Sequence, residues 1–265
     1  MVADVVDEVN RVHAAGVNEV VLAGVHLGGY GSDLQTDLAE LVETLLRETD
    51  IPRIRLGSLE PWELHDTFWS LFADPRVMPH LHLPIQSGAD SVLRRMSRRC
   101  RTAEFASLVD QARAAAPGFN VTTDIIVGYP GETDAEWQQT LTFTESIGFG
   151  HIHIFAYSPR SGTKAAALPD PVSREVKRAR SQQLHELAEQ GRRQVLEHAI
   201  GQPYPVLFEH SETDDSGNQY WVGYTPNYLR VQVPATDHRD LGNTLHTVHA
   251  TGLSEDQKRL QAVMP

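Results

Sequence analysis

The sequence has little cysteine and no long hydrophobic run. Cys100 is the one cysteine among 265 residues, which excludes an intramolecular disulfide framework and is typical of a reducing compartment. No apolar stretch approaches the roughly 20 residues that cross a bilayer. The opening residues MVADVVDEVN are acidic where a signal peptide would be basic. We therefore expect a cytoplasmic protein with no membrane partner.

Basic residues are also in deficit. Lys and Arg number 23 against 35 Asp and Glu, for a net charge of −12. This excess of acid excludes simple electrostatic coating of nucleic acid, although a local basic patch remains compatible with it. Hydrophobic residues make up 40% of the chain, enough for one large domain and a small one.

Amphipathic and apolar segments alternate over the first 157 residues. Short strands separated by helices imply right-handed βαβ units and a parallel sheet, so we expect an α/β fold. Because the series begins with a helix, a barrel of such units would lack its first strand and would have an open edge that favours self-association. We expect the missing strand to lie upstream of Met1. The predicted helices cover 3–15, 37–48, 61–73, 89–97, 103–116 and 133–147, and the predicted strands 19–24, 53–57, 80–85, 121–127 and 151–156.

The pattern changes after residue 157. A loop rich in Pro, Ser and Gly leads into one long helix over 173–199, a connector ended by Gly201. Beyond it, apolar residues alternate around a DDSGN turn, which predicts a small antiparallel β-barrel with Tyr204 and Tyr220 in its core. We expect domains over 1–200 and 201–265.

Six segments resemble one family in its order along the chain. They are GVHLGGYG (24–31), SLEPWEL (58–64), PHLHLPIQSGAD (79–90), TTDIIVGYPGET (122–133), FAYSPRSGT (155–163) and GYTPNYLRV (223–231). Together they resemble the methylthiotransferases among the radical S-adenosylmethionine (radical SAM) enzymes. The last segment favours the branch that acts on threonylcarbamoyladenosine at position 37 of tRNA over the isopentenyladenosine and ribosomal-protein branches.

The resemblance covers the C-terminal part of that family. It implies a partial (β/α) radical SAM barrel lacking its first strand, followed by a small RNA-holding TRAM-like β-barrel. Family enzymes cleave S-adenosylmethionine at one [4Fe–4S] cluster to form a radical that activates C2 of the adenine, and a second cluster delivers the methylthio group. Cysteine thiolates hold such clusters. We predict that Cys100 is an ordinary thiol, so the chain has no cluster ligands and is not catalytically competent alone.

The resemblance also implies a cofactor pocket at the carboxyl ends of the strands, where parallel barrels bind ligands. Gly24 and its neighbours would face the methionine amino group, Ser58 and Glu60 the ribose, and the segment 124–128 the adenine. The predicted cofactor-binding residues are Gly24, Val25, His26, Ser58, Glu60, Gln86, Ser87, Asp124, Gly128, Ala156 and Tyr157.

Two groups of residues are candidates for binding tRNA. A run of arginines suits contact with phosphate, although it could also pair with the acids nearby. In the small barrel, aromatic and polar side chains could stack on and bond an unpaired base. The two groups are Arg94, Arg95, Arg98, Arg99 and Arg101, and Tyr224, Asn227, Tyr228 and Arg230.

Two alternatives remain open. His80 and His82, like His151 and His153, are spaced by two on predicted strands, and with Asp124 they suggest a metal-dependent hydrolase. Their position near the strand starts argues against it, because metal sites in barrels lie at strand ends. The other alternative is a non-catalytic tRNA-binding protein, which differs from an enzyme part only in what lies upstream.

Overall fold

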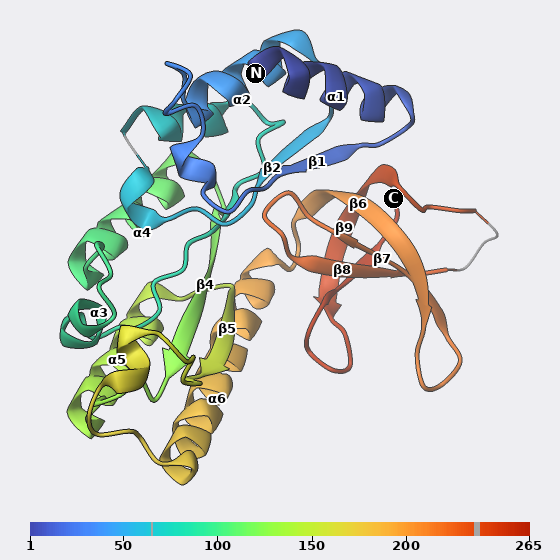
Figure 1. Cartoon of the computed structure of the whole chain (residues 1–265). Coiled ribbons are helices and arrows are strands. Elements are labelled where there is room, and N and C mark those ends of the chain that lie inside the picture. The colour runs from blue at the N-terminus through green and yellow to red at the C-terminus, as the bar shows by residue number, and fades with distance from the viewer. Residues whose placement is uncertain (65, 236–238) are drawn as a thin grey trace.

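The computed structural model describes residues 1–64, 66–235 and 239–265. Its N-terminal part is a curved row of parallel strands, β1 (Glu19–Leu22), β2 (Arg53–Leu56), β3 (His80–His82), β4 (Asn120–Val127) and β5 (His151–Ala156) (Figure 1). β1 pairs with β2, and β4 pairs with both β3 and β5. Two isolated bridges, Ile54 to Val77 and Ser58 to His82, join the β1–β2 sheet to the β3–β4–β5 sheet. The α/β partial barrel expected from the sequence is confirmed.

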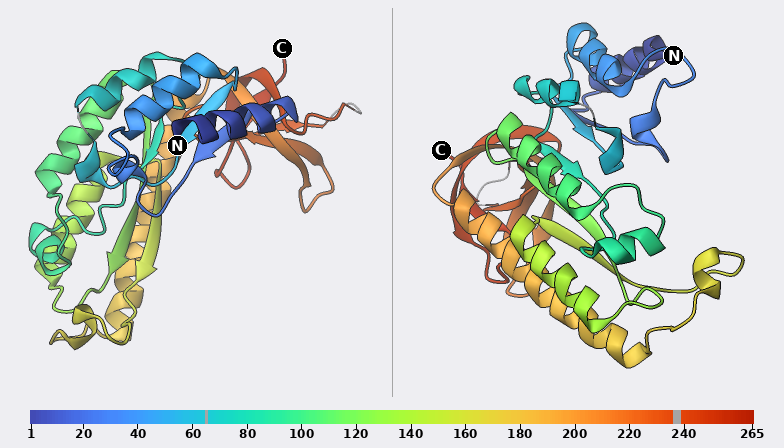
Figure 2. Two further views of the ribbon diagram at one scale, coloured as in Figure 1. Left: turned by 45° about the horizontal axis from the view of Figure 1, so that its top comes forward. Right: turned by 90° about the vertical axis from the view of Figure 1, so that its left-hand side faces the viewer.

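Helices cover the outer face of this row (Figure 2). They are α1 (Val2–Ala14), α2 (Leu38–Glu48), α3 (Asp90–Arg95), α4 (Thr102–Ala115), α5 (Asp134–Ile147) and α6 (Arg174–Ala199). Alternate residues of β4 face the helices, so that Val121, Ile125 and Val127 are buried in the main core. The intervening residues of β4, Thr122, Asp124 and Ile126, therefore project to the inner face of the row.

Local signals explain where helices begin and end. The Thr133 hydroxyl accepts a hydrogen bond from the amide of Glu136, and the Glu136 carboxylate accepts one from the amide of Thr133. This pair of bonds is a capping box at the start of α5. Gly148 ends α5 in the left-handed conformation. The predicted helix over 61–73 is wrong: it is two 3₁₀ segments, Pro61–Glu63 and Asp66–Ala73, and residue 65 lies outside the described residues.

The C-terminal part is a closed barrel in the order β10-β8-β7-β6-β9. Its strands are β6 (Pro203–Thr213), β7 (Gln219–Tyr224), β8 (Arg230–Pro234), β9 (Thr244–Leu253) and β10 (Leu260–Val263). The prediction of an antiparallel barrel needs one correction, because β10 runs parallel to β8. The barrel encloses its own core, in which Val206, Phe208 and Val231 are fully buried.

The loop between β7 and β8 fastens the small barrel to the strand starts of the larger part. The Asn227 amide donates to the carbonyl of Gly118 at 2.9 Å, and the Asn120 amide donates to the carbonyl of Asn227 at 2.9 Å. The Tyr228 ring stacks on His80 with 4.7 Å between the ring centroids, and the Arg55 guanidinium lies over it at 4.8 Å. The two parts of the chain are therefore joined by a polar and aromatic contact.

Candidate functional site

A cavity of about 620 Å³ lies at the carboxyl ends of β4 and β5. Drug-sized and cofactor ligands occupy cavities of roughly 300–1,000 Å³. Four of the predicted cofactor residues, Gln86, Asp124, Ala156 and Tyr157, line it together. The remaining lining residues are Ile126, Phe155, Ser158, Arg160, Thr163 and Ala165. Sequence reasoning did not single these out, although most belong to the segment 155–163, whose polar side chains were the available signal.

Gln86 adopts an unusual backbone conformation at this cavity. Its φ is 77°, a value that residues with a side chain rarely take. Hydrogen bonds on both sides hold it there, because its amide donates to the carbonyl of Asp124 and its carbonyl accepts from the amide of Ile126, each at 2.9 Å. Backbone strain of this kind concentrates at ligand sites, where surrounding contacts maintain it.

Tyr157 forms part of the wall and has an unused polar group. Its hydroxyl is buried and has no hydrogen-bond partner among the described residues. The Tyr129 ring meets it edge-on at 5.3 Å, and Lys177 of α6 donates from Nζ to its carbonyl at 3.1 Å. A buried hydroxyl held in this way can supply a hydrogen bond to a ligand.

The ends of β1 and β2 lie at the same edge of the row and contribute no residue to the lining of the cavity. Gly24, Val25, His26 and Ser58 are exposed there, Val25 completely. The His26 imidazole contacts the Glu63 carboxylate. These four positions are therefore accessible to solvent.

Two of the predicted cofactor residues face protein. Ser87 is wholly buried, and its hydroxyl lies 3.3 Å from that of Thr140 on α5. Gly128 has a φ of 74°, and a Cβ there would come 2.2 Å from Cγ of Lys177. The Ser87 hydroxyl is therefore engaged with Thr140, and Gly128 allows α6 to approach closely.

The predicted histidine pairs lie on the inner face of the row. His82 is the last residue of β3, so the prediction that both pairs lie at strand starts is wrong for this residue. Its Nε2 lies 3.2 Å from the Asp124 carboxylate. His80 is buried near Arg55, and burial lowers its pKa to about 3. Burial also lowers the pKa of His151 to about 4, so both imidazoles are neutral at pH 7.

Three arginines of the predicted RNA-binding run are engaged within the protein. Arg95 pairs with Glu136 at 2.7 Å, and Arg98 pairs with Glu60 at 2.6 Å. Arg101 donates from Nη1 to the carbonyl of Arg98 at 2.7 Å. Glu60, which was predicted to contact the ribose, is therefore ion-paired with Arg98.

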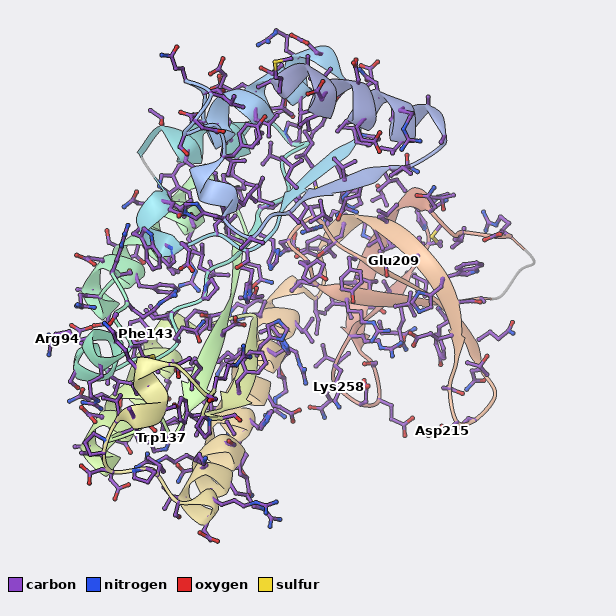
Figure 3. All side chains as sticks on the ribbon, viewed as in Figure 1. Arg94, Trp137, Phe143, Glu209, Asp215 and Lys258 are labelled. Carbon is purple, nitrogen blue, oxygen red and sulfur yellow. The ribbon has the colours of Figure 1, made fainter. Side chains whose placement is uncertain are left out.

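The other two arginines, Arg94 and Arg99, are exposed. Arg94 projects from α3 at the edge of the molecule, far in this view from Asp215 and Lys258 of the small barrel (Figure 3). The Arg99 guanidinium lies over the Trp62 ring at 5.9 Å. These two are the members of the run that are available to a phosphate.

The RNA candidates of the small barrel have partners of their own. Asn227 is buried, and its Oδ1 accepts from the Thr225 hydroxyl at 2.6 Å. Arg230 is ion-paired with Glu212. Tyr224 stacks on Tyr228 with 4.6 Å between centroids, and Tyr228 keeps 43% of its surface exposed. The structure argues against base contact by Asn227, and the faces of the Tyr228 ring are already covered by His80 and Tyr224.

Comparison with known proteins identifies the family of the chain. Residues 2–144 match the radical SAM superfamily. The chain belongs to this superfamily. It is 37% identical over 245 residues to the threonylcarbamoyladenosine tRNA methylthiotransferase MtaB of Thermotoga maritima, covering 91% of this chain and 54% of that protein. The Bacillus subtilis MtaB is 34% identical, covering 88% and 52% respectively. The chain thus spans about half the length of these curated relatives.

Other relatives of this radical SAM chain agree. A tRNA-2-methylthio-N(6)-dimethylallyladenosine synthase of Staphylococcus aureus is 35% identical, covering 84% of this chain and 43% of that protein. Among solved structures, coproporphyrinogen III oxidase of Escherichia coli, a radical SAM enzyme, superposes with a TM-score of 0.56 at 14% identity. It covers 84% of this chain and 59% of that chain, and the likeness shows the fold alone. The resemblance to the methylthiotransferases is confirmed.

The radical SAM family implies an iron–sulfur cluster, and the residues of this chain do not fit one. Cys100 is the one cysteine of the sequence, and it is buried beside α3. Burial raises its pKa to about 11, so the thiolate that binds iron is disfavoured. S-adenosylmethionine does fit, because the cavity has a suitable volume, a carboxylate and an unpartnered buried hydroxyl. Within the described part of the chain, no helix is long and apolar enough to cross a membrane.

Proposed function

We propose that this chain supplies the S-adenosylmethionine pocket and part of the RNA surface of a tRNA methylthiotransferase that acts on N6-threonylcarbamoyladenosine. The main support for the proposal is the 37% sequence identity to MtaB. The matched region is 91% of the chain, so it includes residues of both the partial barrel and the small barrel. The cavity at the ends of β4 and β5 supports it, because parallel barrels bind their ligands at that edge.

The residues of this chain would bind and orient the cofactor. Asp124 would accept hydrogen bonds from its polar groups, Tyr157 would donate its free hydroxyl, and Ile126 and Phe155 would offer apolar surface to the adenine. When bound with a cluster, S-adenosylmethionine supplies the radical of this family. Because this chain has one cysteine, its own contribution is binding, and the cluster ligands must come from other residues.

The RNA contact would use the two exposed arginines of the run. Arg94 and Arg99 would contact phosphates. Replacing both arginines by alanine should weaken tRNA binding and lower the salt slope by about two phosphate contacts. An electrophoretic shift at several salt concentrations measures this. Arg11→Ala on α1, which removes an exposed arginine paired with Glu8, is the matched control and should leave the slope unchanged.

The activity is tested by nucleoside analysis. The full coding region containing this chain would be expressed in a bacterial strain without its own MtaB, and the tRNA would be digested and analysed by mass spectrometry. We expect 2-methylthio-N6-threonylcarbamoyladenosine to appear. Its absence, or appearance of the dimethylallyl derivative instead, would contradict the proposed substrate. This chain expressed alone should give neither product.

A further inference from the structure

Two imidazoles and one carboxylate meet on the inner face of the partial barrel. His82, Asp124 and His153 come from the adjacent strands β3, β4 and β5, and their ligand atoms all lie within 4.8 Å of one another. Asp124 stands directly opposite His153 in the strand pairing, and His82 stands opposite Thr122, two residues before Asp124. Residues spaced by two on a strand project to one face, so the sheet itself brings the three side chains together.

One pair of these atoms already has the spacing that a small divalent ion needs. Zinc binds histidine nitrogen and carboxylate oxygen at about 2.0–2.2 Å, which sets tetrahedral ligand atoms about 3.3 Å apart. Nε2 of His82 lies 3.2 Å from Oδ1 of Asp124. The His82 and His153 rings meet edge-on with 5.5 Å between centroids, so side-chain rotation is needed for both to bind one ion.

An outer contact already orients one of the three. Nδ1 of His82 lies 3.0 Å from the hydroxyl of Thr122, which also lies 3.1 Å from Nε2 of His80. Histidine ligands characteristically hydrogen-bond through the nitrogen that does not bind the metal, which fixes the ring and its tautomer. A proton on Nδ1 directed at Thr122 would leave Nε2 of His82 free to coordinate an ion beside Asp124.

The site is open on two sides. Asp124 lines the cavity at the strand ends, and His153 lines a second hollow of about 260 Å³ with His151, His185 and Glu189. His82 and Asp124 keep 19% and 23% of their side chains exposed. An ion can therefore enter from solvent and retain open coordination positions, as two-histidine, one-carboxylate sites do.

We propose that His82, Asp124 and His153 form a binding site for a divalent transition-metal ion. Zinc is the physiological ion of this proposal, and cobalt is its spectroscopic substitute. Imidazole ligands favour such ions over magnesium and calcium, which prefer oxygen alone. The proposal concerns metal binding only; because Asp124 also lines the proposed cofactor pocket, the metal is titrated in the absence of S-adenosylmethionine. A barrel hydrolase would require a further catalytic base and a substrate, and neither is assigned here.

The test is a cobalt titration of the untagged, metal-stripped chain, followed by its visible absorption and by calorimetry. We expect one equivalent to bind with d–d bands of a four- or five-coordinate ion, and zinc to displace it. Asp124→Asn, which preserves shape, and His153→Ala, at an exposed position, should each weaken binding at least tenfold. Thr122→Val should weaken it about tenfold through the lost orienting contact.

His210→Ala is the matched control, because His210 and Glu212 form a histidine–carboxylate pair at 2.9 Å on the small barrel without a place in this triad. It should leave the affinity unchanged. Failure to bind cobalt or zinc, or equal binding by wild type and both ligand variants, would overturn the proposal. Circular dichroism of each variant shows whether the fold is retained, and His153→Ala keeps the test decisive if Asp124→Asn does not fold.

Discussion

The small barrel is closed, whereas the larger strand row is open, and the two distribute their side chains differently. Inside the small barrel Val206, Phe208 and Val231 are fully buried. On the inner face of β5, His153 is exposed and Phe155 keeps 53% of its surface open. A closed barrel has no edge strands and fills its interior with apolar side chains. The open row instead presents polar and titratable groups, so the candidate sites lie there.

The largest expected effect concerns what holds α6 against the open row. Glu132 is buried with Arg180 at 2.8 Å, and it also accepts a hydrogen bond from the amide of Gly128 at 2.9 Å. Glu132→Gln keeps the shape and leaves the buried guanidinium without its buried counter-ion. We expect the free energy of unfolding to fall by about 3 kcal/mol. Urea denaturation followed by tryptophan fluorescence measures it.

The same guanidinium provides the control. Asp134 also pairs with Arg180, at 2.7 Å, but 98% of its side chain is exposed. Asp134→Asn should therefore cost under about 1 kcal/mol. Equal losses in the two variants would show that burial of the Glu132 pair does not determine the stability of this junction.

The next largest loss of stability is expected at the joint between the two regions, where the β7–β8 loop contacts the starts of the strands. Asn227→Ala removes the hydrogen bond to Gly118 and the one from Thr225, both at a buried position. We expect a loss of about 2 kcal/mol and earlier hydrogen exchange at the β7–β8 loop. Asn218→Ala in the exposed β6–β7 turn is the control, with a loss below about 1 kcal/mol. Unchanged exchange in Asn227→Ala would mean that other contacts hold the barrels together.

Gly88 tests how closely α5 approaches the open row. A Cβ at this position would lie 2.7 Å from the backbone Cα of Thr140, which cannot move without moving the helix. Gly88→Ala should destabilise the chain by about 1–3 kcal/mol through overpacking. Gly252→Ala in the small barrel, where a Cβ would meet nothing within 4 Å, should show no loss in thermal unfolding. A neutral Gly88→Ala would contradict the close approach.

The effect that is smallest at neutral pH, and that grows only in acid, is a pH dependence at the contact between the two regions. Burial lowers the pKa of His80 from 6.5 to about 3, so the unfolded chain binds a proton here over an interval in which the folded chain does not. Stability should therefore fall as the pH drops from about 6.5 toward 3, by about 1.4 kcal/mol per pH unit for this group. His80→Phe should flatten that slope and leave the dependence above pH 7 unchanged. An identical slope in both proteins would show that His80 is not neutral in the folded chain.

Periodic and local signals predicted much of the open row and little of the joint. The alternation of apolar segments predicted β1 to β5, and the Thr133 cap and Gly148 predicted the bounds of α5 closely. The segment 61–73 was misread because Pro61 and a dense aromatic run suggest a regular helix, while the described residues form two 3₁₀ segments. In the small barrel, β9 and β10 were not predicted.

Contacts between distant residues were beyond sequence reasoning. Asn227 looked like a base-binding residue because it is polar and lies in a family segment, yet its partner Gly118 is 109 positions away. Ser87 was assigned to the cofactor although its hydroxyl faces Thr140, 53 positions away. The candidate cavity was predicted better, because the strand-end rule applies wherever parallel strands occur, and Gln86, Asp124, Ala156 and Tyr157 all obey it.

The most direct test of the central claim is a calorimetric titration of the chain with S-adenosylmethionine. We predict saturable binding of one equivalent, weakened several-fold by Tyr157→Phe and abolished by Ala156→Trp, which would fill the cavity at the end of β5. Ala103→Trp, on the exposed face of α4, should bind like the wild type. Absence of saturable binding, or binding that survives Ala156→Trp unchanged, would contradict a cofactor pocket at this edge of the row.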